Sequence, residues 1–146
     1  MTLYLDSSAL VKLYVAEEHS AEVAALAQRG DVTFAWNGLH DLEVRNAIRL
    51  LGSRGTIAPE AHARALAALG ADLATDLYEA GRPDFGKLMK AAERLSGAAT
   101  ALTGARALEL MHVAAAQLGA YAAFATFERR QSGAARVAGL AIFEIV

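Results

Sequence analysis

Near its N-terminus the chain reads Thr2-Leu3-Tyr4-Leu5-Asp6-Ser7-Ser8-Ala9-Leu10-Val11, in which β-forming residues are followed by an acid and then by a helix-forming run. The apolar run Thr2–Leu5 predicts a buried strand that ends at Asp6. Ser8 can cap the helix that follows, from Ala9 to about Ala16. The first two elements are therefore expected to be a strand and a helix, with a carboxylate at their junction.

The rest of the chain continues this alternation. Runs of β-forming residues predict further strands over Val32–Trp36, Tyr121–Thr126 and Ala141–Ile145. Apolar residues at helical spacing predict helices over about Ser20–Gln28, Leu39–Leu51, Glu60–Glu79, Asp84–Leu95 and Ala105–Leu118, with Ser96–Gly104 as a loop or a short helix. Alternating strands and helices form a parallel sheet through right-handed crossovers. We therefore expect a single α/β domain over residues 1–146, with about four central strands and helices on both faces.

The composition suits an ordered protein rather than a disordered one, since 55% of its 146 residues are hydrophobic and 21% are charged. There is no cysteine, which excludes disulfides and thiolate metal sites. The apolar stretch Val113–Phe127 is too short to span a membrane, and the N-terminus lacks the cationic region of a signal peptide. We expect a cytoplasmic protein without membrane association. The net charge of −2 offers no general basic surface, so any binding of RNA would depend on a local site.

Acidic side chains follow two of the predicted strands. Asp6 comes directly after the first strand, and Glu128 comes just after the strand that ends at Thr126. The carboxyl ends of parallel strands meet at one edge of a sheet, so these two acids are expected to lie close together. Oxygen-only clusters suit hard cations such as Mg²⁺ or Mn²⁺. Spacing alone does not decide the role of either acid, because Asp6 can simply cap a helix and Glu128 can lie in a solvated turn.

Four segments, in this order, resemble the motifs of the PIN-domain family, and in particular the VapC-type toxin ribonucleases of type II toxin–antitoxin systems. They are Tyr4–Tyr14 (YLDSSALVKLY) around Asp6, His40–Ala47 (HDLEVRNA) around Glu43, Ala105–Ala116 (ARALELMHVAAA) around Glu109, and Ala125–Arg130 (ATFERR) around Glu128. Order and separation are similar to the family pattern from residue 3 to residue 130. Glu109 and Glu128 depart from that pattern, because the family has Asp at both places.

The resemblance implies a PIN-like fold and a metal-dependent endoribonuclease that hydrolyses RNA phosphodiester bonds with Mg²⁺ or Mn²⁺. It implies Asp6 as the central ligand, Glu43 and Glu109 as ligands directly or through water, and Glu128 at a second metal or beside the attacking water. Taken alone, Glu43 can be an exposed helix residue, and Glu109 can serve the dipole of its helix. The longer Glu side chains can also weaken catalysis, which leaves a second interpretation open: a PIN-like domain that binds nucleic acid or protein.

The resemblance also implies supporting residues and partners. Ser8 and Thr126 carry hydroxyls that can orient a carboxylate or a water, and His112 is expected to be a structural hydrogen-bonding residue rather than a ligand. Five basic residues can contact phosphates around the same edge or simply be solvated: Lys12, Arg45, Arg49, Arg129 and Arg130. The expected partners are RNA, a cognate antitoxin and a second copy of the chain. A helical hairpin made of Leu39–Leu51 and Ala61–Tyr78 is the surface implied for the antitoxin and the homodimer.

Overall fold

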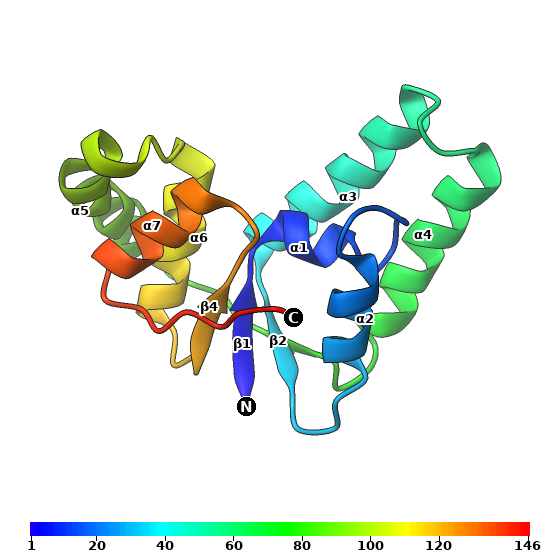
Figure 1. Cartoon of the computed structure of the whole chain (residues 1–146), viewed down its shortest axis with the longest axis horizontal. Coiled ribbons are helices and arrows are strands. Elements are labelled where there is room, and N and C mark those ends of the chain that lie inside the picture. Colours follow the sequence, from blue (N-terminus) through cyan, green and yellow to red (C-terminus); the bar gives the residue numbers. More distant parts are fainter.

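The computed structural model describes all of residues 1–146 and contains one four-stranded sheet with helices packed on both faces (Figure 1). All strand pairs are parallel, and the strand order is β3-β2-β1-β4. The strands are β1 (Thr2–Leu5), β2 (Thr33–Trp36), β3 (Tyr78–Ala80) and β4 (Ala123–Ala125). This is the α/β architecture that the sequence predicts.

Seven helices divide between the two faces of the sheet. One face carries α1 (Ser7–Val11), α2 (Ser20–Ala27), α3 (Gly38–Ser53) and α4 (Pro59–Asp72). The other carries α5 (Phe85–Thr103), α6 (Ala107–Leu118) and α7 (Arg129–Val137), which Figure 1 shows as a separate group at the left. Strand β1 supplies both cores by alternation, because Leu3 and Leu5 are buried against the first group and Tyr4 against the second.

The strand order creates a switch point between β1 and β4. From β1 the chain proceeds to β2 and β3 on one side, and it then returns to form β4 on the other side of β1. The connections leave the carboxyl ends of β1 and β4 in opposite directions, which opens a crevice between them. The residues that follow these two strands, Asp6 and Thr126–Glu128, therefore border the crevice.

The predicted helix over Glu60–Glu79 was wrong in its second half. Helix α4 ends at Asp72, where the Thr75 hydroxyl donates to the Asp72 carbonyl (2.7 Å), and Tyr78–Ala80 then forms the edge strand β3. Three residues are too few for an alternation to be recognised. Pairing with β2, in the register Phe34 to Tyr78, is what makes this segment a strand.

The C-terminal half contains three further corrections. Ser96–Gly104, expected to be a loop or a short helix, is helical to Thr103 as the continuation of α5, because buried residues recur along one face to Ala99, and the helix ends at Gly104 with φ of 69°. Helix α7 was not predicted, since its Gln, Ser and Gly residues are weak helix formers. Ala141–Ile145 is not a strand, because it makes only one isolated bridge, from Ile142 to Phe124.

The helical hairpin was predicted correctly apart from its last residues. Helices α3 and α4 lie side by side in Figure 1, joined by a turn at Gly55 with φ of 70°. Pro59 stands in the first turn of α4, as its sequence position suggested. None of the helices combines the length and the apolar character that crossing a membrane requires.

Candidate functional site

The four predicted acids line one pocket of about 250 Å³ at the carboxyl edge of β1 and β4. They come from four elements that are distant in sequence: the end of β1, helix α3, helix α6 and the start of α7. The lining residues are Asp6, Ser7, Ser8, Glu43, Arg106, Leu108, Glu109, His112, Glu128, Arg130 and Gln131. Of the two supporting residues expected from sequence, Ser8 is part of the lining and Thr126 is not.

Asp6 is the most deeply placed acid, with 5% of its surface exposed. It is Asp6, rather than Ser8, that caps α1, because its Oδ1 accepts from the backbone N–H of Ala9 (3.1 Å). Ser8 lies inside the helix, and its hydroxyl donates to Asp6 Oδ2 (2.6 Å). Burial raises the pKa of Asp6, and Glu128 raises it further, against the opposing effects of the Ser8 and Ala9 hydrogen bonds and of His112.

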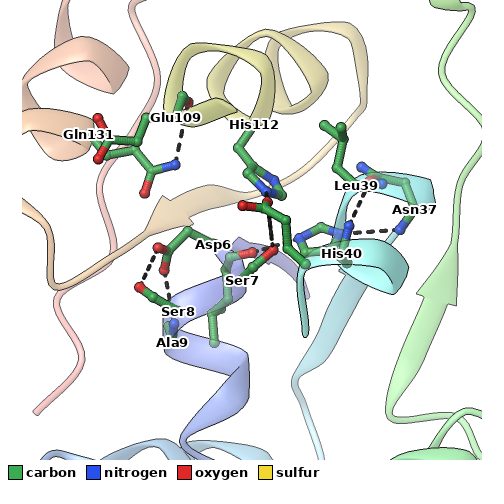
Figure 2. A network of polar contacts seen from close by, with 12 residues as sticks. Asp6, Ser7, Ser8, Ala9, Asn37, Leu39, His40, Glu109, His112 and Gln131 are labelled. Atoms are coloured by element: carbon green, nitrogen blue, oxygen red, sulfur yellow. Dashed lines mark hydrogen bonds and ion pairs between the residues drawn. The ribbon is translucent and has the colours of Figure 1, made fainter. Parts of the chain in front are cut away.

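Glu43 is held by a set of buried polar residues that we call the Glu43 cluster: Tyr4, Ser7, Asn37 and His112 around the Glu43 carboxylate. Figure 2 shows the His112 ring above Ser7. The Ser7 hydroxyl donates to Glu43 Oε1 (3.1 Å), and His112 Nε2 contacts the same oxygen. On its other side the ring nitrogen Nδ1 of His112 lies 2.8 Å from the Tyr4 hydroxyl.

The hydrogen-bonding pattern of the Glu43 cluster has a definite direction. The side-chain amide of Asn37 donates to the Tyr4 hydroxyl (3.0 Å), so the Tyr4 proton is free to point toward His112 Nδ1. A histidine that accepts at Nδ1 carries its proton on Nε2 and donates it to Glu43. Burial raises the pKa of Tyr4 far above its ordinary value, so the hydroxyl keeps its proton. This series of hydrogen bonds, from Asn37 through Tyr4 and His112, ends on the Glu43 carboxylate and orients it.

His40 fastens the start of α3 to the end of β1. The backbone N–H of Asn37 donates to His40 Nδ1 (3.1 Å), and His40 Nε2 donates to the Leu5 carbonyl (2.8 Å). Burial lowers the pKa of His40 to about 3, so the ring is neutral. Glu43 lies one helical turn after His40 and on the same face of α3. His40 therefore sets where Glu43 enters the pocket.

Glu109 has different partners, which we call the Glu109 cluster: Arg106, Glu109 and Arg130. Its Oε2 accepts from the backbone N–H of Arg106 (2.7 Å), and its Oε1 forms an ion pair with Arg130 (3.4 Å). The first contact is half of a capping box at the N-terminus of α6. The contacts of Glu109 thus agree with a role at the terminus of its own helix.

Gln131 and Thr126 join α7 to α6 beside these acids. Gln131 is 1% exposed and donates from Nε2 to the Glu109 carbonyl (3.3 Å), as Figure 2 shows. The Thr126 hydroxyl donates to Gln131 Oε1 (3.1 Å) and accepts from the backbone N–H of Glu128 (3.0 Å). Thr126 thereby holds the backbone at Glu128 in place. The Glu128 side chain is exposed and free of hydrogen bonds and ion pairs to other side chains.

The donor set fits a hard divalent cation in chemical type, since four carboxylates and the Ser8 hydroxyl supply only oxygen. The pKa of Asp6 is raised mainly by its burial and in smaller part by the charge of Glu128. In the arrangement described, no three acidic or histidine side chains come close enough together to hold an ion. Asp6 and Glu109 each have both carboxylate oxygens engaged, but Asp6 accepts from the uncharged Ser8 hydroxyl and Ala9 N–H, whereas Glu109 is paired with the guanidinium of Arg130.

The fold is similar to that of a solved structure, FitAcB from Neisseria gonorrhoeae. The two match with a TM-score of 0.64 over 97% of this chain and 96% of that chain, at 17% sequence identity. No family model and no curated protein sequence matches the chain. At this level of identity the likeness concerns the fold, and it agrees with the PIN-like α/β fold that the four sequence motifs imply.

Several residues of the site were not predicted from sequence. Ser7, Tyr4, Asn37 and His40 all take part in placing Glu43, although none of them was expected to belong to the site. Arg106 was not expected there either, although it lines the pocket. Ser7, Tyr4, Asn37 and His40 each bond to a residue that is distant in sequence, as Tyr4 does to His112, so no local pattern reveals these four.

Proposed function

We propose that this protein is a metal-dependent endoribonuclease that hydrolyses RNA phosphodiester bonds. The supporting observation is the convergence of Asp6, Glu43, Glu109 and Glu128 on one pocket at the switch point of a PIN-like sheet. Ligands in open parallel sheets bind at this position, outside the carboxyl ends of the strands. Motif resemblance and geometry thus select the same edge of the molecule.

Asp6, Glu43 and Glu128 are the residues that we propose hold a Mg²⁺ or Mn²⁺ ion, directly or through water. Such an ion lowers the pKa of a bound water and neutralises charge on the phosphate. Ser8 orients Asp6, and His112 with Ser7 orients Glu43, so that two of the three carboxylates are preset before an ion binds. Glu109 also lines the pocket, but its charge is already paired with the guanidinium of Arg130.

The electrostatics of the pocket support a cation-dependent activity. Four carboxylates in one pocket repel one another and repel the phosphates of RNA, and the charge of Glu128 adds to the larger effect of burial in raising the pKa of Asp6. A bound divalent cation reverses the sign of the potential that a phosphate meets. We therefore expect RNA to bind more tightly when the cation is present.

The activity is tested by incubating the purified chain with a mixed RNA substrate in Mg²⁺ or Mn²⁺. We expect cleavage that stops on addition of EDTA and is lost in Asp6→Asn. Asp41→Asn is the matched control: Asp41 lies on the same helix as Glu43, is half-buried and pairs with Arg45 outside the pocket (3.0 Å). Equal cleavage by wild type and Asp6→Asn would mean that the activity belongs to a contaminant or another site.

The alternative interpretation, a PIN-like module that binds without cleaving, is favoured by the engagement of both Glu109 oxygens. Titration calorimetry with Mn²⁺ distinguishes the two functions. An ion that binds in the wild type and not in Asp6→Asn supports the nuclease. RNA binding that persists without any Mn²⁺ binding supports the module.

We further propose that the chain is the toxin of a toxin–antitoxin pair and forms a homodimer. This proposal rests on the resemblance of the four segments to the motifs of VapC-type toxins, and a groove on the protein surface supports it. The groove measures about 360 Å³, lies between Leu13–Ala16 and α4, and has a mostly apolar lining. An apolar segment of an antitoxin fits such a surface. Co-expression with the product of the neighbouring reading frame tests it: we expect a stable complex that Ala68→Glu, at an exposed position of the groove lining, disrupts.

A further inference from the structure

Both oxygens of the Glu109 carboxylate are engaged within the protein. Oε2 accepts from the backbone N–H of Arg106 at 2.7 Å, and Oε1 pairs with the Arg130 guanidinium at 3.4 Å. The side chain is 19% exposed, so these contacts face the pocket at the protein surface rather than open solvent. Asp6 also uses both oxygens, but its donors are the uncharged Ser8 hydroxyl and Ala9 N–H. Glu43 uses one oxygen for His112 and Ser7, and Glu128 has no side-chain partner, so Glu109 is the acid that an arginine pairs with.

Glutamate makes this arrangement possible at position 109. The residue stands at the third position of α6, from which a Glu side chain can reach back to the N–H that precedes the helix. The reach directs the carboxylate toward the helix terminus and toward α7. Glu109, which stands where the PIN-domain pattern has Asp, uses its longer side chain to cap α6 and to pair with Arg130.

Arg130 and Arg106 are the two guanidinium-bearing residues of the pocket lining. Arg130 is 40% exposed and is held at the pocket by Glu109, whereas Arg106 has no ion-pair partner for its side chain. A guanidinium group matches the geometry of a phosphate and is never deprotonated in proteins. The α6–α7 side of the pocket thus presents positive charge beside the carboxylates of Asp6 and Glu128.

We propose that Arg130 contacts a backbone phosphate of the RNA, and that Glu109 is the positioning residue that holds Arg130 there rather than a ligand of the metal ion. The assignment rests on the proposed function, since it takes RNA as the substrate. Asp6, Glu43 and Glu128 then remain as the carboxylates available to the ion. Arg106 lies on the same side and adds to the attraction for phosphate.

The role of Glu109 is tested by comparing two identical substitutions, Glu109→Gln and Glu128→Gln, by calorimetric titration with Mn²⁺. The amide oxygen of Gln can still cap α6. We expect Glu109→Gln to change the Mn²⁺ affinity by less than about 3-fold, and Glu128→Gln to weaken it by at least about 10-fold. A loss in Glu109→Gln as large as in Glu128→Gln would overturn the assignment and make Glu109 a ligand.

The role of Arg130 is tested by the binding of a fluorescein-labelled single-stranded RNA, measured by anisotropy in Ca²⁺ with the RNA checked for integrity. Arg130→Ala should weaken binding by roughly 5- to 10-fold and reduce the slope of log K against log salt by about 0.7. Arg130→Lys should recover part of the loss. Arg136→Ala is the matched control, because Arg136 is an exposed residue of the same helix outside the pocket. Equal effects of Arg130→Ala and Arg136→Ala would overturn the proposal.

The two proposals fail in distinguishable ways. If the wild type binds RNA through Arg130 but never cleaves it, the phosphate contact is upheld and the nuclease activity is refuted. If the wild type cleaves RNA, Asp6→Asn does not, and Arg130→Ala has the KM of the wild type, then the nuclease activity is upheld and the phosphate contact is refuted. A KM that rises in Arg130→Ala with kcat nearly unchanged supports both.

Discussion

The Glu43 cluster and the Glu109 cluster place carboxylates in the same pocket by different physical means. Glu43 comes from the face of the sheet that carries α3, and its main partner His112 is a hydrogen-bonded ring that is 3% exposed. Glu109 comes from the opposite face, and its partner Arg130 is a cation that is 40% exposed. One carboxylate is oriented by a buried hydrogen-bond chain and the other by a charge pair at the surface.

The difference teaches how each side can respond to a ligand. A buried chain such as Asn37–Tyr4–His112 is costly to disturb, because each group that loses its partner is left unsatisfied away from water. A half-exposed ion pair contributes little to stability, so Arg130 can turn part of its guanidinium toward a phosphate at small cost while Glu109 still holds it. The side of the pocket that carries Glu43 is therefore fixed by the protein before a ligand binds, whereas the side that carries Glu109 can rearrange when a ligand binds.

The largest effect is expected from Asp6→Asn, which removes the acid at the centre of the site. Cleavage should fall by more than about 100-fold, beyond what is usual for residues that only support ligands. Burial raises the pKa of Asp6 above 3.8, so between 3.8 and the raised value the folded protein holds a proton that the unfolded chain has released. Stability therefore falls as pH rises through this window. Asn keeps the helix cap, so the variant should melt above wild type at pH 7.

Differential scanning calorimetry at pH 7 and at pH 3 checks the stability part of this prediction. The gain in melting temperature should be present at pH 7 and should disappear at pH 3, where Asp6 is protonated in both states. A variant that melts below the wild type at pH 7 would contradict this prediction, because it would show that the buried charge of Asp6 stabilises the fold.

A smaller but still large effect is expected on breaking the Glu43 cluster with His112→Ala. The Tyr4 hydroxyl loses its acceptor, and stability should drop by about 1–3 kcal/mol. Cleavage should fall by about 10- to 100-fold, because Glu43 loses the donor that orients it. Urea denaturation and steady-state kinetics measure the two effects. A folded variant with normal kcat would mean that His112 has a structural role alone.

His40→Gln tests the side of the pocket that carries Glu43, through the dependence of the free energy of unfolding on pH. The folded pKa of His40 is about 3 against 6.5 for the free side chain, so between these values the unfolded chain binds a proton that the folded protein excludes. His40 therefore costs stability as pH falls from 6.5, by up to about 1.4 kcal/mol per pH unit. Gln can bond both Asn37 and Leu5, and its curve of stability against pH should be flatter below pH 6.5. If the curves of stability against pH were parallel for the wild type and His40→Gln, the loss of stability below pH 6.5 would not come from His40.

The smallest effect is expected from Glu128→Asp, on the side of the pocket that carries Glu109. Mg²⁺ demands near-ideal octahedral geometry, which a long exposed side chain supplies less well, so the wild type should be roughly 3-fold more active in Mn²⁺ than in Mg²⁺. Shortening the side chain to the family's Asp should narrow that ratio. Initial rates at equal metal concentrations measure it. A ratio that widens would mean that the backbone at Thr126–Glu128 is already placed for glutamate.

The acids of the site were predictable because each stands in a recognisable local setting. Asp6 ends an apolar strand, and Glu43, Glu109 and Glu128 lie in segments that resemble family motifs. The partners of these acids were not predictable. Glu43 and His112 are 69 residues apart, and Tyr4 and His112 are 108 apart, so their contacts exist only once α3 and α6 meet across β1.

The sequence by itself determined the alternation of strands and helices, the acid after β1 and the four-motif order, because these depend on local propensity and on periodicity along the chain. Only the tertiary structure decided that Tyr78–Ala80 is a strand, since three residues become a strand by pairing with β2. It also decided which oxygens remain free, with Glu43 oriented by a buried hydrogen-bond chain and Glu109 engaged by arginines. Hydrogen bonds and ion pairs between distant segments have no local signature, because their energy depends on where packing brings the partners together.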